Sequence, residues 1–203
     1  MEQTQQYKGC TIRIEQDQDA ESPRTWSNTG TMACMHRRYN LGDQQFQTTQ
    51  ALVASIPLGA VRLPLYLYDH SGLSMQTRPY SCPWDSGQVG WIWVSRQAVL
   101  KEYGWKVLTA KRRAQVEAYL VGEVEAYDAY LQGNVYGYVA EGPQGEDIGS
   151  CWGFFDTGTC VEGKNIDMAY MLGQAQGEID AWLTDRAERA RQAGNGRGRQ
   201  PRG

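Results

Sequence analysis

The sequence has 203 residues, 41% of them hydrophobic and 21% charged; these values exclude a disordered or fibrous chain and allow a sizeable core. The formal net charge of −3 is unevenly distributed, because residues 186–203 hold six arginines against one acid and leave −8 on the first 185 residues. An acidic body disfavours broad, nonspecific binding of nucleic acid by the folded part of the chain.

Three further features of the sequence bear on where the protein works. The opening residues, MEQTQQYKG, have neither the basic nor the apolar stretch of a secretory leader, and no window approaches the roughly 18 apolar residues of a membrane span. The five cysteines are odd in number and include no C-x-x-C pair, which is typical of free thiols and unlike a zinc ribbon or a disulfide framework. We therefore expect a cytoplasmic protein with no membrane contact.

The first half of the chain is predicted to contain strands separated by polar connectors. Alternating apolar residues predict strands over 7–15 and 29–36, and a connector with a short helix follows over 44–60. Two stronger strands, 63–68 and 89–94, lie on either side of a polar, turn-rich insert. Ser95 then caps a short helix that Gly104 closes.

The clearest element is a long helix that Thr109 begins and Gly133 ends. Five apolar residues recur on it every three or four positions, the spacing of a buried helical stripe. They are Val116, Leu120, Val124, Tyr127 and Leu131.

Residues 134–156 predict a β-hairpin with its turn at 142–145, and we expect Cys151 to be buried in it. A last helix follows over about 164–191. Its predicted inward residues are Ala169, Leu172, Ala175, Ile179 and Trp182. Gly173 and Gly177, four residues apart on the same helix, are expected to allow close packing on a sheet.

This order of elements lacks the strand–helix alternation of a parallel sheet. It predicts an α+β protein with a single domain over residues 1–185, in which two long amphipathic helices pack on an antiparallel sheet. Residues 186–203 are predicted to contain the helix end and a disordered Arg/Gly-rich arm.

The polar insert over residues 69–88 is the main candidate for function, because sites are commonly carried on loops between rigid strands. A basic and aromatic step, HRRY over 36–39, supplies a second polar group. We expect one partner-binding surface formed by His36, Arg37, Arg38, Tyr39, Asp69, His70, Trp84, Asp85 and Gln88. The alternative for the two arginines is a local ion pair with Asp17, Asp19 or Glu21.

Catalysis is an alternative use of the same insert. A Cys–His–Asp set could be formed by His70, Cys82 and Asp85, or by Asp69 in place of Asp85. With His36 and Asp43 added, these side chains also offer nitrogen, oxygen and sulfur ligands for a metal, although no ligand pair has a recognisable spacing, so the metal stays unknown. The alternative hypothesis is therefore a small hydrolase or nuclease that uses His36, Asp69, His70, Cys82 and Asp85.

A nucleic-acid-binding accessory protein is the third hypothesis. Its contacts would be Lys111, Arg112 and Arg113 at the start of the long helix and Arg197, Arg199 and Arg202 in the arm. No phosphate-binding loop and no dinucleotide-binding glycine motif is present, so we expect no nucleotide cofactor.

Four strings of the chain, taken together, resemble a family of small proteins encoded by phages, prophages and plasmids. They are ESPRTW (21–26), GTMACMHRRYNLGD (30–43), LPLYLYDHSG (63–72) and CPWDSGQVG (82–90), and the likeness covers about residues 7–185. The resemblance implies an inhibitor of a host defence system, of anti-CRISPR or antirestriction type, acting in the host bacterial cytosol. Such a protein would be a binding protein rather than an enzyme, and its partner would be a defence nuclease or its nucleic-acid complex.

Overall fold

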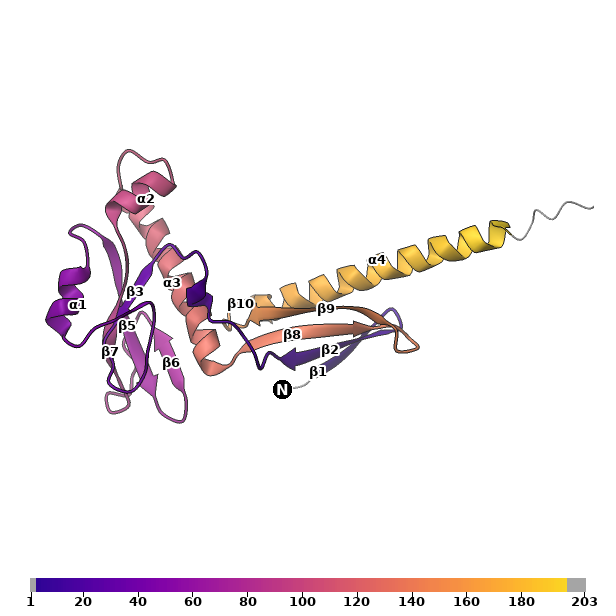
Figure 1. The fold of residues 1–203 in the computed structure, drawn as a ribbon, viewed down its shortest axis with the longest axis horizontal. Helices are drawn as coiled ribbons and strands as arrows, with labels where there is room; N and C mark the ends of the chain where they lie inside the picture. Colours follow the sequence, from indigo (N-terminus) through magenta and orange to yellow (C-terminus); the bar gives the residue numbers. More distant parts are fainter. Residues whose placement is uncertain (1–2, 197–203) are drawn as a thin grey trace, which may run out of the picture. The chain divides into compact units, whose positions relative to one another are not determined.

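The computed structural model describes residues 3–196, with side chains described up to residue 193. These residues form two compact units, coloured by sequence in Figure 1. The inserted unit comprises residues 21–134, and the terminal unit comprises residues 3–20 together with the chain from Val135 onward. The α+β class predicted from the sequence is confirmed, since helices and antiparallel sheets occur in both units.

The terminal unit contains a four-stranded antiparallel sheet with the order β1-β2-β8-β9. The strands are β1 (Gln3–Tyr7), β2 (Cys10–Gln16), β8 (Val135–Glu141) and β9 (Asp147–Phe155). A two-stranded ribbon, β10 (Cys160–Val161) with β11 (Lys164–Asn165), leads into the helix α4 (Ile166–Gly196). This helix runs along β8 and β9 (Figure 1).

The strand predicted over residues 7–15 is in fact part of a hairpin. Lys8 and Gly9 both have positive φ, +48° and +82°, and they join β1 to β2 in the backbone conformation that suits a two-residue hairpin turn. β1 has the sequence QTQQY, so it lacks the apolar alternation by which a strand is recognised.

β2 and β8 are neighbours in the sheet although 118 residues lie between Gln16 and Val135. The backbone N–H of Asp17 donates to the carbonyl oxygen of Val135 at 2.8 Å, just where the ladder ends. The chain therefore leaves the sheet and returns to it at one point, and the inserted unit is an insertion between two paired strands.

The core of the terminal unit lies between the sheet and α4. Met171, Ala175 and Ile179 supply its helical side, four residues apart, while Leu172 and Trp182 are only partly buried. Ala169, predicted to point inward, is exposed. Met171 is buried in its place. Its side chain is larger than that of Ala169, so turning it toward the sheet buries more apolar surface.

Two further predictions for this unit are corrected. Gly173 and Gly177 are exposed and a methyl group added at either would meet nothing within 4 Å, so they do not serve close packing on the sheet. Cys151 is exposed rather than buried, as is Cys160. It lies in β9, an edge strand of the sheet.

The inserted unit has a five-stranded sheet with the order β4-β3-β7-β5-β6, antiparallel except for the β3–β4 pair. Its strands are β3 (Thr31–Cys34), β4 (Gln44–Gln45), β5 (Val61–Asp69), β6 (Leu73–Gln76) and β7 (Ser86–Val94). Its helices are the 3-10 turn η1 (Pro23–Thr25), α1 (Thr49–Ser55), α2 (Arg96–Glu102) and α3 (Ala110–Gln132). The long helices α3 and α4 therefore pack on different sheets, whereas the sequence predicted one sheet for both.

Short polar side chains begin the helices of the inserted unit. Thr48, Ser95 and Thr109 each accept a hydrogen bond from a backbone N–H in the first turn, of α1, α2 and α3 respectively. Gly133 ends α3 with φ +71°, a conformation that glycine adopts without strain. The predicted ends of this helix are confirmed.

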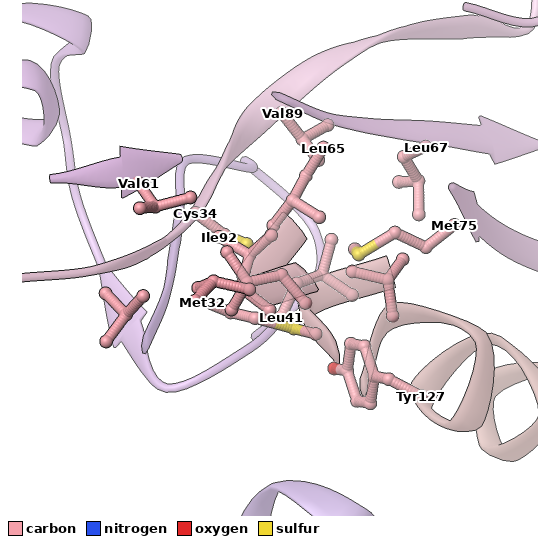
Figure 2. Packing of buried hydrophobic residues seen from close by; sticks show 14 of the residues in the cluster. Met32, Cys34, Leu41, Val61, Leu65, Leu67, Met75, Val89, Ile92 and Tyr127 are labelled. Atoms are coloured by element: carbon pink, nitrogen blue, oxygen red, sulfur yellow. The ribbon is translucent and has the colours of Figure 1, made fainter. Parts of the chain in front are cut away.

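Figure 2 shows the core of the inserted unit, where α3 meets the inner face of the sheet. Val116, Leu120, Val124 and Tyr127 are buried as predicted, and Leu131 is partly buried at the edge. Opposite them lie buried residues of β3, β5, β6 and β7, among them Met32, Leu65, Met75 and Ile92.

A buried ionic network fixes the first loop of this unit. The Arg24 guanidinium, 6% exposed, donates to both oxygens of Asp43, at 2.9 and 2.6 Å, to Glu123 of α3 at 2.9 Å and to the carbonyl of Gly30 at 2.7 Å. Asp43 also accepts from the backbone N–H of Met32, and Glu123 accepts from the N–H of Gly30. One arginine thus ties a loop, a strand and the long helix together.

Candidate functional site

The site begins at an irregularity between β5 and β7. Leu65 pairs with Gly90 and Tyr66 pairs with Gln88, so Val89 is an extra residue in β7. The carbonyl of Val89 accepts a hydrogen bond from the backbone N–H of Met35, where the chain leaves β3. Bulges of this kind bend a strand and re-aim its side chains, and they are frequent beside functional sites.

Gly90 makes the close approach of β3 and β7 possible here. A Cβ atom at this position would lie 2.1 Å from the carbonyl oxygen of Ala33, far inside van der Waals contact. Only glycine therefore allows the bulge to form at this place in the ladder.

A groove of about 620 Å³ lies beside the bulge, a size within the range of ligand pockets. We call it the Trp84 groove. Its floor is apolar and its rims are polar. The residues that line it are Met35, His36, Arg37, Arg38, Phe46, Gln47, Leu67, Asp69, Trp84, Asp85, Ser86, Gly87, Gln88 and Val89.

The basic rim follows β3. The Nδ1 atom of His36 accepts from the backbone N–H groups of Arg38 and Tyr39, at 3.3 and 3.2 Å, and the His36 ring stacks on the Tyr39 ring with centroids 5.0 Å apart. The imidazole thereby shapes the turn that presents the two arginines. Arg37 makes no hydrogen bond or ion pair with any other residue that the structure describes, and Arg38 is 72% exposed.

The acidic rim is formed by the end of β5 and the start of β7. Asp69 accepts from the Tyr39 hydroxyl at 3.2 Å and lies 3.4 Å from the Arg38 guanidinium. Asp85 lies 3.4 Å from Nδ1 of His70 and 3.5 Å from the Cys82 thiol. The backbone N–H of Asp69 donates to the carbonyl of Asp85, so the two rim strands hold the carboxylates in place.

Trp84 stands beside this rim with 92% of its surface exposed. A tryptophan so exposed contributes nothing to a core, and indole rings are among the most frequent anchors of protein interfaces. Gln88 and Gln47 add exposed amides to the same groove.

The groove gathers most of the surface predicted from the sequence. Seven of the nine proposed residues line it, namely His36, Arg37, Arg38, Asp69, Trp84, Asp85 and Gln88. The remaining two, Tyr39 and His70, hold lining residues from the side. Arg38 pairs with Asp69, not with the acids of the loop before η1 that the alternative named.

Sequence reasoning missed the floor, which consists of Met35, Phe46, Leu67 and Val89. Leu67 and Val89 have the pattern of ordinary core residues. Phe46 did carry a signal, since it is the one large apolar side chain in the polar run QQFQTTQ.

The geometry gives little support to thiol catalysis. Asp85 lies between Cys82 and His70, whereas a nucleophilic set needs the imidazole next to the thiol to take its proton. A thiolate also needs a cation beside it, and here the neighbour is a carboxylate. Cys34, under the groove, is buried, and its burial raises its pKa to about 12.

A metal centre has no donor set in the part of the chain that the structure describes. No group of three His, Cys, Asp or Glu side chains converges there. The Nδ1 atom of His36 is already used by the turn.

The basic step at the start of α3 lies elsewhere in the inserted unit. Arg112 donates to the carbonyl of Val107 and covers the Trp105 ring, with 4.9 Å from its guanidinium carbon to the ring centroid. Arg113 lies 4.0 Å from Glu117, and Lys111 is exposed. The arm residues proposed for nucleic acid, Arg197, Arg199 and Arg202, lie outside the described residues.

Comparison with protein-family models, with curated proteins and with solved structures gives no match to this chain. Between residues 3 and 196, no helix is both long enough and apolar enough to cross a bilayer. Function therefore has to be inferred from the groove and from the distribution of charge.

Proposed function

We propose that this protein is a binding protein, encoded by a phage or another mobile element, that inhibits a host defence system. It acts by occupying a defence nuclease or the nucleic-acid complex of that nuclease, and the Trp84 groove is its main contact. One observation carries the proposal: an almost fully exposed indole stands beside a groove with an apolar floor and charged rims. Interfaces commonly combine an aromatic anchor with an apolar centre and a polar rim.

The distribution of charge supports a nuclease as the partner. Residues 1–20 and 135–193 of the terminal unit carry 14 acids and six bases, a formal charge of −8, whereas the inserted unit carries nine acids and 11 bases. A surface so acidic is attracted to the basic channel that a nuclease presents to nucleic acid. The charge of the whole chain, −3, hides this concentration.

Infection of bacteria that carry one defined defence system tests the proposal. Cells that express the protein should give more plaques of a phage that the system restricts, and the nuclease should co-purify with the tagged protein. Trp84→Ala should reduce both effects strongly, because truncation of a central interface tryptophan costs about 2 kcal/mol or more of binding free energy.

Trp26→Ala is the matched control, since Trp26 is half-exposed in the same unit and does not line the groove. Loss of protection in both variants would point to damage of the fold rather than of a contact. Absence of protection and of an enriched nuclease across a panel of restriction and CRISPR systems would end the proposal.

The hydrolase alternative makes a different prediction. If Cys82 were a nucleophile, Cys82→Ser would abolish turnover of ester, peptide or nucleic-acid substrates and leave binding of the partner unchanged. If the protein acts by binding alone, this conservative change leaves protection of the phage at the wild-type level.

A further inference from the structure

The Trp84 groove continues into a second, smaller pocket. This pocket has a volume of about 200 Å³ and shares Met35, Gln88 and Val89 with the groove. The shared residues are those of the β7 bulge and of the chain leaving β3. The bulge therefore separates two recesses that share its residues. The groove extends from it toward Trp84, and the smaller pocket extends toward α1.

The second pocket is apolar, and we call it the α1 pocket. Leu52 and Val53 of α1 form one wall and Trp91 of β7 forms the other. The Thr49 hydroxyl lies 4.0 Å from the Met35 sulfur and closes the space between α1 and the strand. No Asp, Glu, Lys or Arg lines this pocket, so it suits an uncharged, apolar group.

The charges along the Trp84 groove are not equally satisfied. Asp69 is held across the groove by Tyr39 and Arg38 of the basic rim, and Asp85 is held by His70 and Cys82 beside it. The Arg37 side chain has none among the described residues, and the Arg38 guanidinium lies 3.4 Å from Asp69 and over the Tyr39 ring, 5.3 Å from its centroid. The Arg37 guanidinium is therefore the group left for a ligand, and a guanidinium fork pairs best with a carboxylate or a phosphate.

We infer that the two recesses together bind a segment of a partner protein in which an acidic residue lies close to a large apolar one. The acidic side chain pairs with Arg37, the apolar side chain enters the α1 pocket, and the segment crosses the bulge between them. This inference rests on the proposed function, because it names the chemistry that the binding protein recognises on its partner.

A nucleic-acid strand fits these observations less well. The two arginines of the groove are balanced by two aspartates, so the lining has no formal net charge, and polyanion binding needs a surplus of cations. The apolar floor and the α1 pocket also offer nothing to successive phosphates. A protein segment uses both features.

Selection from a phage-displayed library of random dodecapeptides on the purified full chain tests the inference. The enriched peptides should carry Asp or Glu within a few positions of Leu, Ile, Met, Phe or Trp. Arg37→Glu should weaken a synthetic copy of such a peptide by about tenfold or more, because it replaces attraction by repulsion at the rim. In a fresh selection, Arg37→Glu should remove the preference for acids.

Val53→Asp tests the α1 pocket. In a selection on this variant, the peptides should lose the preference for large apolar residues and keep the preference for acids. Val53 is 43% exposed, so the change spares the core. Arg78→Glu is the control, because Arg78 is exposed in the same unit and lines neither recess.

Two results would overturn the inference: enrichment of no peptide, or enrichment of peptides without an acid. Competition by the single-stranded oligonucleotide dT20 would instead assign the groove to nucleic acid. None of these measurements involves a defence system, so a protein that enriches the expected peptides but fails to protect phage would sink the proposed function alone.

Discussion

The terminal and inserted units share one architecture but differ in how their strands are connected. Each packs one long helix on one face of a largely antiparallel sheet. In the terminal unit short turns join β1 to β2 at Lys8–Gly9 and β8 to β9 over 142–145, and residues 1–20 and 135–193 carry a formal charge of −8. In the inserted unit long polar connections interrupt the sheet, a bulge deforms its central strand, and the Trp84 groove forms there.

The comparison shows that the site depends on how strands are connected rather than on the sheet itself. In connections such as residues 35–43 and 70–85, backbone N–H and C=O groups lie outside the hydrogen-bond ladder of the sheet. Side chains have to supply hydrogen-bonding partners for them. His36 does this for the connection over 35–43, and Arg24 does it for the loop before β3 through the carbonyl of Gly30. In the terminal unit the hairpin turns are short, and the side chains of Asp156, Asn165 and Asp167 satisfy backbone N–H groups in the connection from β9 to α4.

The largest expected difference between the units is the unfolding free energy that each loses when its ionic network is broken. Arg24→Met leaves Asp43 and Glu123 without their cation in a largely buried place, and it should cost the inserted unit about 3–5 kcal/mol. Urea unfolding, with amide hydrogen exchange resolved by peptide, should show the loss in residues 21–134.

Arg13→Met is the matched change in the terminal unit. Arg13 also pairs with two glutamates, Glu15 and Glu141, but it is 34% exposed, so a much smaller loss is expected. Equal losses in the two variants would contradict the view that only the inserted unit depends on a buried network.

The second expected effect concerns the bulge. Gly90→Ala should destabilise the inserted unit by about 1–3 kcal/mol, because the new methyl group meets the Ala33 carbonyl and the strands must separate. Gly87→Ala, in the same strand with open space around it, should cost far less in the same unfolding experiment. The peptide affinity of the groove should fall in the first variant only.

A third experiment should stabilise the terminal unit. Gly173→Ala and Gly177→Ala lie in the exposed interior of α4, where glycine disfavours the helix, so each should add about 0.5–1 kcal/mol. Thermal unfolding followed by circular dichroism measures the gain. A loss of stability would mean that these positions make contacts on which the helix depends.

The smallest expected effect is a dependence on pH in the terminal unit. The hydrogen bond from Lys8 lowers the pKa of Asp180, so the folded state favours the carboxylate. That stability is present above the usual aspartate pKa of about 3.9 and is lost as the pH falls through the lower folded value. Asp180→Asn should flatten the slope of unfolding free energy below about pH 4, while Asp185→Asn, one turn along α4, serves as the control.

The sequence predicted what depends on neighbouring residues. The ends of α3 at Thr109 and Gly133 are local chemistry, and its stripe is local periodicity. The polar rims of the groove were also visible, because charged and aromatic residues gather between two strongly apolar strands.

What the sequence could not predict depends on distant contacts. The bulge at Val89 arises from the approach of β3, and the short strand β6 forms by pairing with β5. On α4, Ala175 and Ile179 are buried as predicted, whereas the sheet buries Met171 more fully than Leu172 and leaves Ala169 exposed.

The strings over residues 21–26, 30–43, 63–72 and 82–90 contain residues that the fold explains and residues that lie in the groove. Arg24, Gly30 and Asp43 belong to the buried network, so their presence is explained by the fold. Arg37 and Trp84 lie in the groove and take no part in that network, while Gln88 lies in the groove and also donates to the carbonyl of Gly90 at the bulge.

The insertion between β2 and β8 imposes an order of events on folding. During synthesis, 118 residues must leave the ribosome after β2 before its second partner strand, β8, exists. Closing an unstructured loop of that length costs roughly 4 kcal/mol of chain entropy, and prior folding of residues 21–134, which brings the two junctions together, removes most of that cost. Until then Cys10, Ile12 and Ile14 have no cover, and the growing chain is most open to aggregation in that interval.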